Sequence, residues 1–131
     1  MRRVVLVVQV VLGLYFVAVG VMHFVVPDGL PEQMEWMYDL PTWTHWVSGA
    51  AEVAGGLGLI LPRLTQVRME LEPLAAAGLV IVMLGAVVYH ASRGEAQNIV
   101  FNLVLAGLLG WIAAVRWRGV DAPMGTTPAH G

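Results

Sequence analysis

The stretch VVLVVQVVLGLYFVAVGVMHFVV, residues 4–26, is an apolar run in which one glutamine and one late histidine are the only strongly polar side chains. About 20 helical residues cross a bilayer, so this run is long enough to span a membrane. Three further apolar stretches follow, at residues 44–61, 74–91 and 98–115. The sequence therefore predicts an all-α integral membrane four-helix bundle, with residues 1–118 forming a single four-span domain.

The composition supports a membrane protein. Hydrophobic residues make up 58% of the chain and charged residues 12%, whereas a soluble domain carries about a quarter charged residues. The seven cationic side chains are all arginines and are scattered, which leaves no basic patch for nucleic acid. The absence of cysteine excludes disulfides, thiolate metal sites and dithiol redox chemistry. The lipid bilayer is therefore the first predicted partner.

The charges predict the orientation of the spans. Acidic residues crowd the segment 27–43, and the segments at the other ends of the spans are rich in arginine. Because arginine-rich loops face the cytoplasm, both termini are predicted to be cytoplasmic. The tail at residues 119–131 is predicted to be flexible. The six arginines on the predicted cytoplasmic side are Arg2, Arg3, Arg63, Arg68, Arg116 and Arg118.

The segment 27–43 is predicted to form a short amphipathic helix on the outer surface. Its acidic residues share one helical face, while Met34, Met37 and Tyr38 share another. The tryptophans at positions 36, 43 and 46 match an interfacial aromatic belt and are predicted to anchor the membrane boundary, with stacking on a ligand as the alternative.

Two helical stripes of small and polar residues lie within the first two spans. A spacing of four, three, four and three residues keeps each stripe on one face, and its glycines allow a neighbouring helix to approach. Gly55, Gly107 and Gly110 are likewise predicted to pack helices. The stripes are Gln9, Gly13, Phe16, Gly20 and His23 in the first span, and His45, Gly49, Glu52 and Gly56 in the second.

Glu52 is the most informative single residue, because a charged side chain deep in a bilayer costs about 3 kcal/mol unless it is paired, protonated or hydrated. It lies roughly 10 to 14 Å below the predicted outer boundary. The other polar residues of the spans, apart from Gln9, gather in the same half. We therefore predict an outward-facing polar pocket with Glu52 at its floor. Its predicted ligand-binding residues are His23, His45, Tyr89, Asn98 and Asn102, with His90 beside them.

A carboxyl beside histidines suits proton transfer to or from an organic molecule, as quinone chemistry and double-bond isomerisation require. A metal is an alternative, since two histidines and a carboxylate suit non-haem iron or zinc, and a haem held by two histidines is another. Simpler interpretations also stand: interfacial histidines, a helix-capping Asn98, or a Glu52 that only joins helices. The metal-ligand candidates are His23, His45, Glu52 and His90.

Four segments in order resemble the DoxX family of small four-helix membrane proteins. The segments are GVMHFVVP at residues 20–27, GAAEVAGGLGLILP at 49–62, LAAAGLVIVMLGAVVYHASRGE at 74–95 and NIVFNLVL at 98–105. The glutamate flanked by small residues and the late histidine before Arg-Gly-Glu carry the resemblance most closely. The likeness covers nearly the whole chain.

The resemblance implies a multi-pass protein of a bacterial plasma membrane, with Glu52 and His90 as the functional, catalytic positions. Some members of the family are subunits of a thiosulfate:quinone oxidoreductase or parts of membrane redox-stress complexes. His23 departs from the family pattern, because relatives often carry another basic residue there. Three functions stay open: a quinone-linked or redox-associated subunit, a self-contained enzyme or carrier for a small lipophilic molecule, and a non-catalytic assembly protein. A homo-oligomer or a redox partner subunit is compatible with each.

Overall fold

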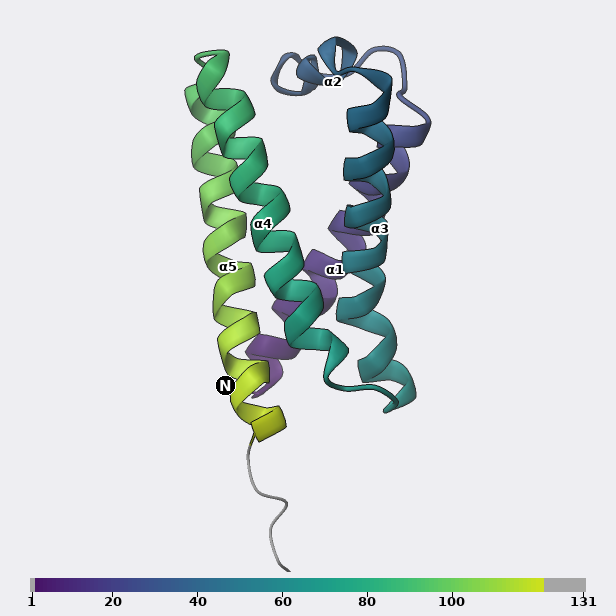
Figure 1. The fold of residues 1–131 in the computed structure, drawn as a ribbon, viewed down its shortest axis with the longest axis vertical. Helices are drawn as coiled ribbons and strands as arrows, with labels where there is room; N and C mark the ends of the chain where they lie inside the picture. The colour runs from purple at the N-terminus through teal and green to yellow at the C-terminus, as the bar shows by residue number, and fades with distance from the viewer. Residues whose placement is uncertain (1, 122–131) are drawn as a thin grey trace, which may run out of the picture.

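The structure, a computed structural model, describes residues 2–121, and every regular element within them is helical (Figure 1). Four long helices run side by side, and a short helical segment crosses one end of the bundle. The elements are α1 (Arg2–Phe24), the 3₁₀ turn η1 (Glu32–Met34), α2 (Trp36–Asp39), α3 (Thr42–Thr65), α4 (Leu71–Ser92) and α5 (Ala96–Asp121). We call the end crossed by α2 the α2 end. The opposite end, which carries Arg2, Arg63 and Arg116, is the arginine end.

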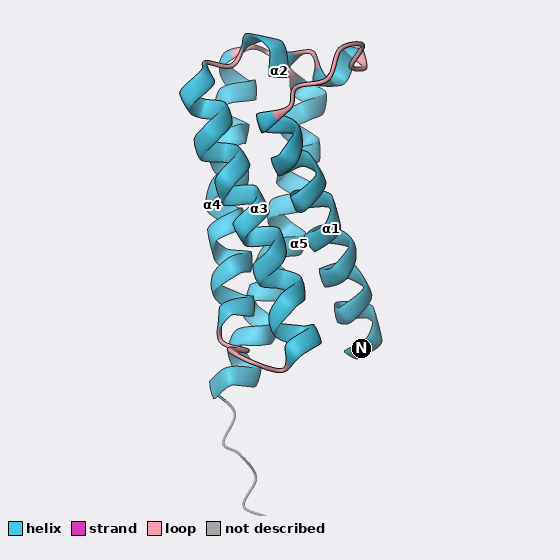
Figure 2. Ribbon diagram, turned by 90° about the vertical axis from the view of Figure 1, so that its right-hand side faces the viewer, coloured by secondary structure: helices cyan, strands magenta, loops and turns pink. Residues whose placement is uncertain are grey.

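The bundle consists of two helix pairs. Helix α1 packs along α3, α4 packs along α5, and α3 joins the pairs through α4 (Figures 1 and 2). Apolar side chains from all four helices form one buried core between the pairs. Its members are Leu12, Phe16, Leu59, Ala76, Leu79, Met83, Leu105, Leu109 and Ile112.

Paired glycines bring α1 and α3 into backbone contact. Added Cβ atoms at Gly20 and Gly49 would each lie 2.9 Å from the carbonyl oxygen of the other residue. At Gly56, an added Cβ would lie 2.6 Å from the carbonyl oxygen of Gly13. No side chain larger than hydrogen fits these positions without separating the helices. The predicted packing role of the two glycine stripes is confirmed.

The other predicted packing glycines divide into two groups. Gly55 lies against Leu79 of α4, where an added Cβ would meet side-chain carbons at 2.5 Å. Gly107 and Gly110 have open space within 4 Å of an added Cβ, so the prediction that they pack helices is wrong for contacts within the described chain. They lie on α5, away from its partners.

Three of the long helices, α1, α4 and α5, are long and apolar enough to cross a membrane. Helix α3 has 24 residues, but His45, Glu52 and Arg63 lower its apolar character and it is not among the three. Large apolar side chains such as Leu14, Ile81 and Val88 are exposed on the sides of the bundle, where hydrocarbon would cover them. The protein is thus a multi-pass, all-α membrane protein.

The segment 27–43 forms η1 and α2 rather than one continuous amphipathic helix. The Tyr38 hydroxyl accepts a hydrogen bond from the Leu30 backbone N–H and donates one to the Pro27 carbonyl, which fixes the loop. Met37 is fully buried beneath it. At the other end of the chain, α5 continues through Asp121, and the rest of the predicted flexible tail, residues 122–131, lies outside the described residues.

Candidate functional site

Two cavities at the α2 end meet beside Glu52. The larger, of about 740 Å³, lies between α1 and α5, and we call it the lateral cavity. The smaller, of about 320 Å³, lies between α3 and α4. Both are lined by Trp36, Glu52, Ala86 and His90, so these side chains stand between the two openings.

The lateral cavity exists because α1 and α5 separate towards the α2 end. At the arginine end Gln9 of α1 accepts a hydrogen bond from Arg116 of α5. Midway along the helices, the rings of Tyr15 and Phe101 meet edge to face at 6.0 Å. Above these rings the two helices leave a space lined mainly by apolar side chains, with the amides of Asn98 and Asn102 on the α5 wall.

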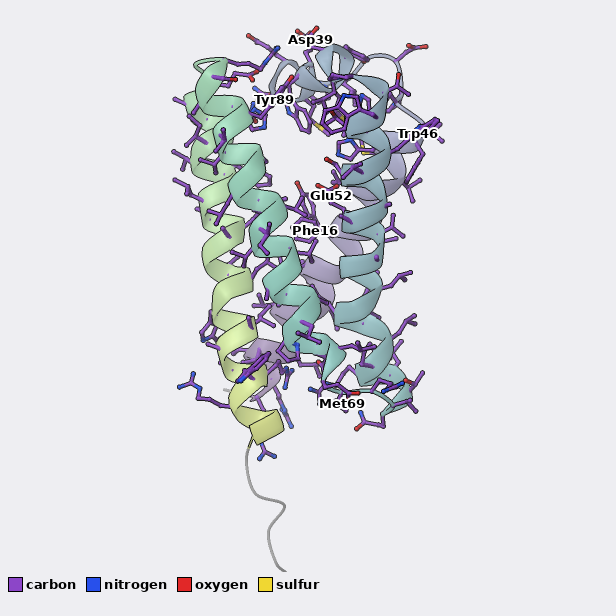
Figure 3. All side chains as sticks on the ribbon, viewed as in Figure 1. Phe16, Asp39, Trp46, Glu52, Met69 and Tyr89 are labelled. Carbon is purple, nitrogen blue, oxygen red and sulfur yellow. The ribbon has the colours of Figure 1, made fainter. Side chains whose placement is uncertain are left out.

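Glu52 is buried without a full set of partners. The residue is 5% exposed, and its Oε2 has no hydrogen-bond partner among the described residues. The His23 ring lies close to it, with His23 Nε2 3.5 Å from Glu52 Oε2. Figure 3 shows Glu52 between the two helix pairs, with Tyr89 nearer the α2 end. A buried carboxyl oxygen without a partner is costly, because no hydrogen bond offsets the loss of its hydration.

The polar chain continues from Glu52 through two histidines. His23 Nδ1 lies 2.9 Å from His45 Nδ1, and His45 Nε2 lies 2.8 Å from the Met37 carbonyl oxygen. Because a carbonyl only accepts, His45 Nε2 donates, and a neutral His45 then accepts at Nδ1 from His23 Nδ1–H. His23 Nε2 therefore faces Glu52 without a hydrogen of its own, unless the ring is protonated. The contact is favourable when one proton lies on either His23 Nε2 or Glu52 Oε2.

His90 forms the second titratable group of the site. Its Nδ1 lies 3.1 Å from Glu95 Oε1, and Arg93 donates to the same carboxylate at 2.8 Å. A carboxylate only accepts, so His90 Nδ1 carries the hydrogen and Nε2 of the neutral ring is left as the proton acceptor. Arg93 also pairs with Asp39 at 2.7 Å and so ties the α2 segment to the α4–α5 turn.

Trp36 closes the site from the α2 end. Its ring lies 5.0 Å from the His90 ring and 6.1 Å from the His23 ring, and it lines both cavities. The sequence placed Trp36 in a membrane-anchoring belt with Trp43 and Trp46. Those two are more than 60% exposed, as an interfacial anchor would be, whereas Trp36 turns inward. No local pattern distinguishes the three, because the difference arises from the fold of the loop.

A family model described as the DoxX-like family matches residues 7–113. This chain belongs to the DoxX-like family. The match runs from the first turns of α1 nearly to the end of α5 and so includes the whole site. No curated protein and no solved structure gives a significant match.

The site of this DoxX-like protein brings together most of the side chains that the sequence singled out. Glu52, His90, Asn98 and Asn102 line the lateral cavity, and His23 and Tyr89 line the smaller one with Glu52 and His90. The buried Tyr89 hydroxyl has no hydrogen-bond partner among residues 2–121. His45 lines neither cavity and acts on Glu52 only through His23.

The alternative of a metal centre does not fit this geometry. Within residues 2–121, no three His, Asp or Glu side chains gather closely enough to hold an ion. Both ring nitrogens of His45 are engaged, one by His23 and the other by the Met37 carbonyl. A metal or haem iron at His45 would have to displace one of these hydrogen bonds.

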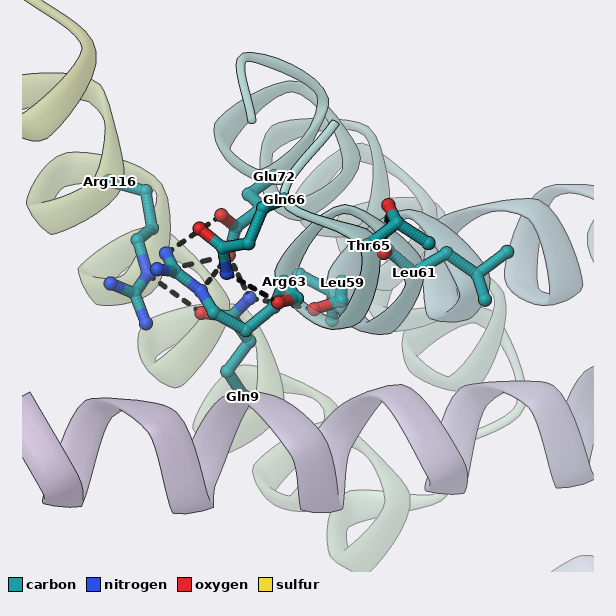
Figure 4. Close-up of polar contacts among 8 residues, drawn as sticks. All are labelled: Gln9, Leu59, Leu61, Arg63, Thr65, Gln66, Glu72 and Arg116. Atoms are coloured by element: carbon teal, nitrogen blue, oxygen red, sulfur yellow. Dashed lines mark hydrogen bonds and ion pairs between the residues drawn. The ribbon is translucent and has the colours of Figure 1, made fainter. Parts of the chain in front are cut away.

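A second buried polar cluster, at the arginine end, was missed by the sequence interpretation. Glu72 is 1% exposed and is held by Arg63, whose Nη2 donates to Glu72 Oε1 at 2.8 Å (Figure 4). Gln9 donates to Glu72 Oε2 and to the Leu59 carbonyl, and Arg116 donates to Gln9. The predicted third span began at residue 74, which placed Glu72 in a loop. Pro73 follows Glu72, and because proline favours the first turn of a helix, it was the available signal that the helix begins before residue 74.

The Glu95 contact provides a test by pH. Burial raises the pKa of Glu95, but the hydrogen bonds from His90 and Arg93 outweigh it and hold the pKa below its ordinary value. A carboxyl group whose pKa is lower in the folded than in the unfolded protein stabilises the fold at pH values above its unfolded pKa. This stabilisation is lost as the pH falls through the folded pKa. We expect the amount by which Glu95→Gln lowers the thermal midpoint to be largest near pH 7 and to shrink as the pH falls below the ordinary pKa of a carboxyl group. Glu32→Gln, which removes an exposed carboxylate, is the control, and a Glu95→Gln deficit that persists at low pH would contradict the assignment.

Proposed function

We propose that this DoxX-like protein is a redox-associated membrane subunit that binds a quinone in the lateral cavity, with Glu52 and His90 as proton partners. The observation that supports this proposal most directly is that Glu52 Oε2, a buried carboxyl oxygen, has no hydrogen-bond partner among the described residues. Glu52 lines a largely apolar cavity of about 740 Å³. Cavities of roughly 300–1,000 Å³ with a few convergent polar groups are typical of small-molecule sites.

The position of the cavity supports a lipophilic ligand. Val100, Phe101 and Val104 line it and are also largely exposed on the side of α5. The opening therefore faces the region where hydrocarbon would surround the bundle. A molecule dissolved in the bilayer can reach Glu52 without passing through water, and the aromatic rings of Tyr15, Phe16 and Trp36 offer flat surfaces to a ring.

The polar chain supports proton handling. A quinone supplies two-electron chemistry in which its oxygens gain or lose protons, and such chemistry needs groups that hold a proton at the ring. Glu52 Oε2 faces His23 Nε2 at 3.5 Å, and His45 fixes the His23 ring through its own bond to Met37. His90 has its Nδ1 hydrogen held by Glu95, so its Nε2 is the second position for a proton. A partner subunit would supply the electrons.

The proposal includes an orientation. The arginine end would face the cytoplasm under the positive-inside rule, which places both termini inside and the α2 end outside. Helix α3 would be the fourth span, with its polar residues turned to the site rather than to lipid. The membrane would be the plasma membrane of a bacterium.

The test is quinone binding by Glu52→Gln. Purified protein in mild detergent would be titrated with a short-chain benzoquinone and a short-chain naphthoquinone, with quenching of tryptophan fluorescence as the readout. Loss of a hydrogen bond to a charged group is worth about 1.5–3 kcal/mol, so we expect binding to weaken about 10- to 100-fold. Glu70→Gln, at an exposed site near the arginine end, is the matched control and is expected to bind normally.

Mass spectrometry of molecules that copurify with the wild type and with Glu52→Gln separates the remaining alternatives. A quinone lost only in the mutant supports the proposal. A different lipophilic molecule, bound or converted by the purified chain alone, would favour a self-contained enzyme or carrier. If both folded proteins carry and bind nothing, Glu52 only joins helices and the assembly role replaces the proposal.

A further inference from the structure

We infer that the arginine end holds a second ligand site, for a phosphate-bearing anion. A cavity of about 490 Å³ opens there, remote from Glu52, and three of its lining residues are arginines. They come from α1, α3 and α5, and Glu72 of α4 lies among them. The lining residues that carry the inference are Arg2, Arg63, Glu72 and Arg116, with Leu6 and Val115 as apolar walls.

The site has a rigid, buried framework. Glu72 is almost completely buried and accepts hydrogen bonds from Gln9 and from Arg63, which uses both Nε and Nη2. Gln9, which is fully buried, accepts in turn from Arg116 Nε at 2.8 Å. Each of the four long helices contributes one of these side chains. The guanidinium groups of Arg63 and Arg116 are therefore held in place before any ligand arrives (Figure 4).

The framework leaves positive charge uncompensated. Among the described residues that line the cavity, three guanidinium groups lie with one carboxylate, which gives these four side chains a formal charge of +2. Arg116 makes all its polar contacts with the described residues through Nε, so its two terminal nitrogens remain available as donors. Arg2 is exposed at the rim. An anion at this point would neutralise the surplus charge and receive hydrogen bonds from more than one guanidinium.

The donor set suits a phosphate group. Planar guanidinium groups match the oxygens of phosphate, often in bidentate pairs. The apolar walls next to these donors suit an amphiphile whose phosphate sits at the membrane boundary and whose chains run along the bundle. The chemistry shared by a lipid headgroup and a free phosphate ion is the phosphate oxygens, and the experiment distinguishes the two sources.

The test compares neighbouring arginines. Arg2 lines the cavity and Arg3, the next residue, does not. Arg116 lines it and Arg118 does not; within residues 2–121, Arg118 bonds only to Ala114 of its own helix. The matched variants are therefore Arg2→Gln with Arg3→Gln, and Arg116→Gln with Arg118→Gln. Arg2→Gln is the decisive one, because an exposed arginine at the start of α1 can be replaced without disturbing the buried framework.

Dioctanoyl phosphatidylglycerol, dioctanoyl phosphatidylcholine and inorganic phosphate would each be titrated into detergent-purified protein, with native mass spectrometry for the lipids and calorimetry for phosphate. We expect phosphatidylglycerol to bind at least tenfold more tightly than phosphatidylcholine, with about a tenfold loss in Arg2→Gln and Arg116→Gln and none in the controls. Binding of inorganic phosphate alone, with the same dependence on Arg2, would support the site and identify a free ion as its ligand. Equal binding by all four variants, or no binding of any anion, would overturn the inference.

Discussion

Glu72→Gln is expected to destabilise the protein by about 3 kcal/mol, since removing one partner of a buried ion pair leaves the other charge without compensation. Glu72 is the carboxylate for Arg63 and lies 3.6 Å from Arg116. The side chains of these arginines are 28% and 18% exposed, so solvent relieves part of the penalty and the estimate sits at the low end of the usual range. The amide still accepts at one oxygen but cannot neutralise either guanidinium.

The measurement is the free energy of unfolding in mixed micelles, followed by helical circular dichroism. Glu70→Gln is the control, because it removes an equivalent pair with Arg68 in which both side chains are largely exposed. A surface pair is worth about 0–1 kcal/mol, so this variant should remain close to wild type. Equal effects of the two substitutions would show that Glu72 contributes no more than a surface charge.

Gly56→Ala is expected to destabilise the protein by about 1–3 kcal/mol, although alanine is the better helix former. The added methyl would lie 2.6 Å from the Gly13 carbonyl oxygen and 2.9 Å from the Val17 backbone nitrogen. Backbone atoms cannot rotate away as a flexible side chain can, so α1 and α3 must separate. That movement would also disturb the His23 contact with Glu52, which bridges the same two helices.

Gly78→Ala is the matched control for this prediction. Gly78 is also in mid-helix but, unlike the buried Gly56, it is exposed, and no described atom lies within 4 Å of its added Cβ. There the intrinsic preference for alanine should stabilise the helix by about 0.5–1 kcal/mol. Thermal midpoints in one detergent would test the pair, and a Gly56→Ala protein as stable as Gly78→Ala would refute the close approach of α1 and α3.

The sequence predicted those features that depend on periodicity within one helix. The spacing of Gln9, Gly13 and Gly20 on one face was visible, and the structure buries that face against α3. The same reasoning placed Glu52 on the inner face of its helix. A repeat along a helix reveals which face is buried, because the geometry of the helix alone fixes it.

Features that depend on how distant segments meet were not predictable in this way. Glu72 is buried by Gln9 and Arg116, which lie far from it in sequence, and no local sequence pattern indicates these contacts. Trp36 resembles the neighbouring tryptophans until the loop folds it over His90. Gly107 and Gly110 show the converse, since their spacing matches a packing motif but their face of α5 meets no other described helix.

Because α1 and α5 separate near the α2 end, the lateral cavity opens to the membrane, and this determines whether the concentration of a ligand in the membrane or in water sets its occupancy. A ligand that enters between these helices equilibrates with the membrane, so its occupancy follows its amount per lipid rather than its amount per volume of water. At the same concentration in water, two molecules with the same contacts at Glu52 would then differ in occupancy according to how strongly each dissolves in hydrocarbon. Affinities for this cavity are therefore comparable only when they are expressed as mole fractions in the bilayer or micelle.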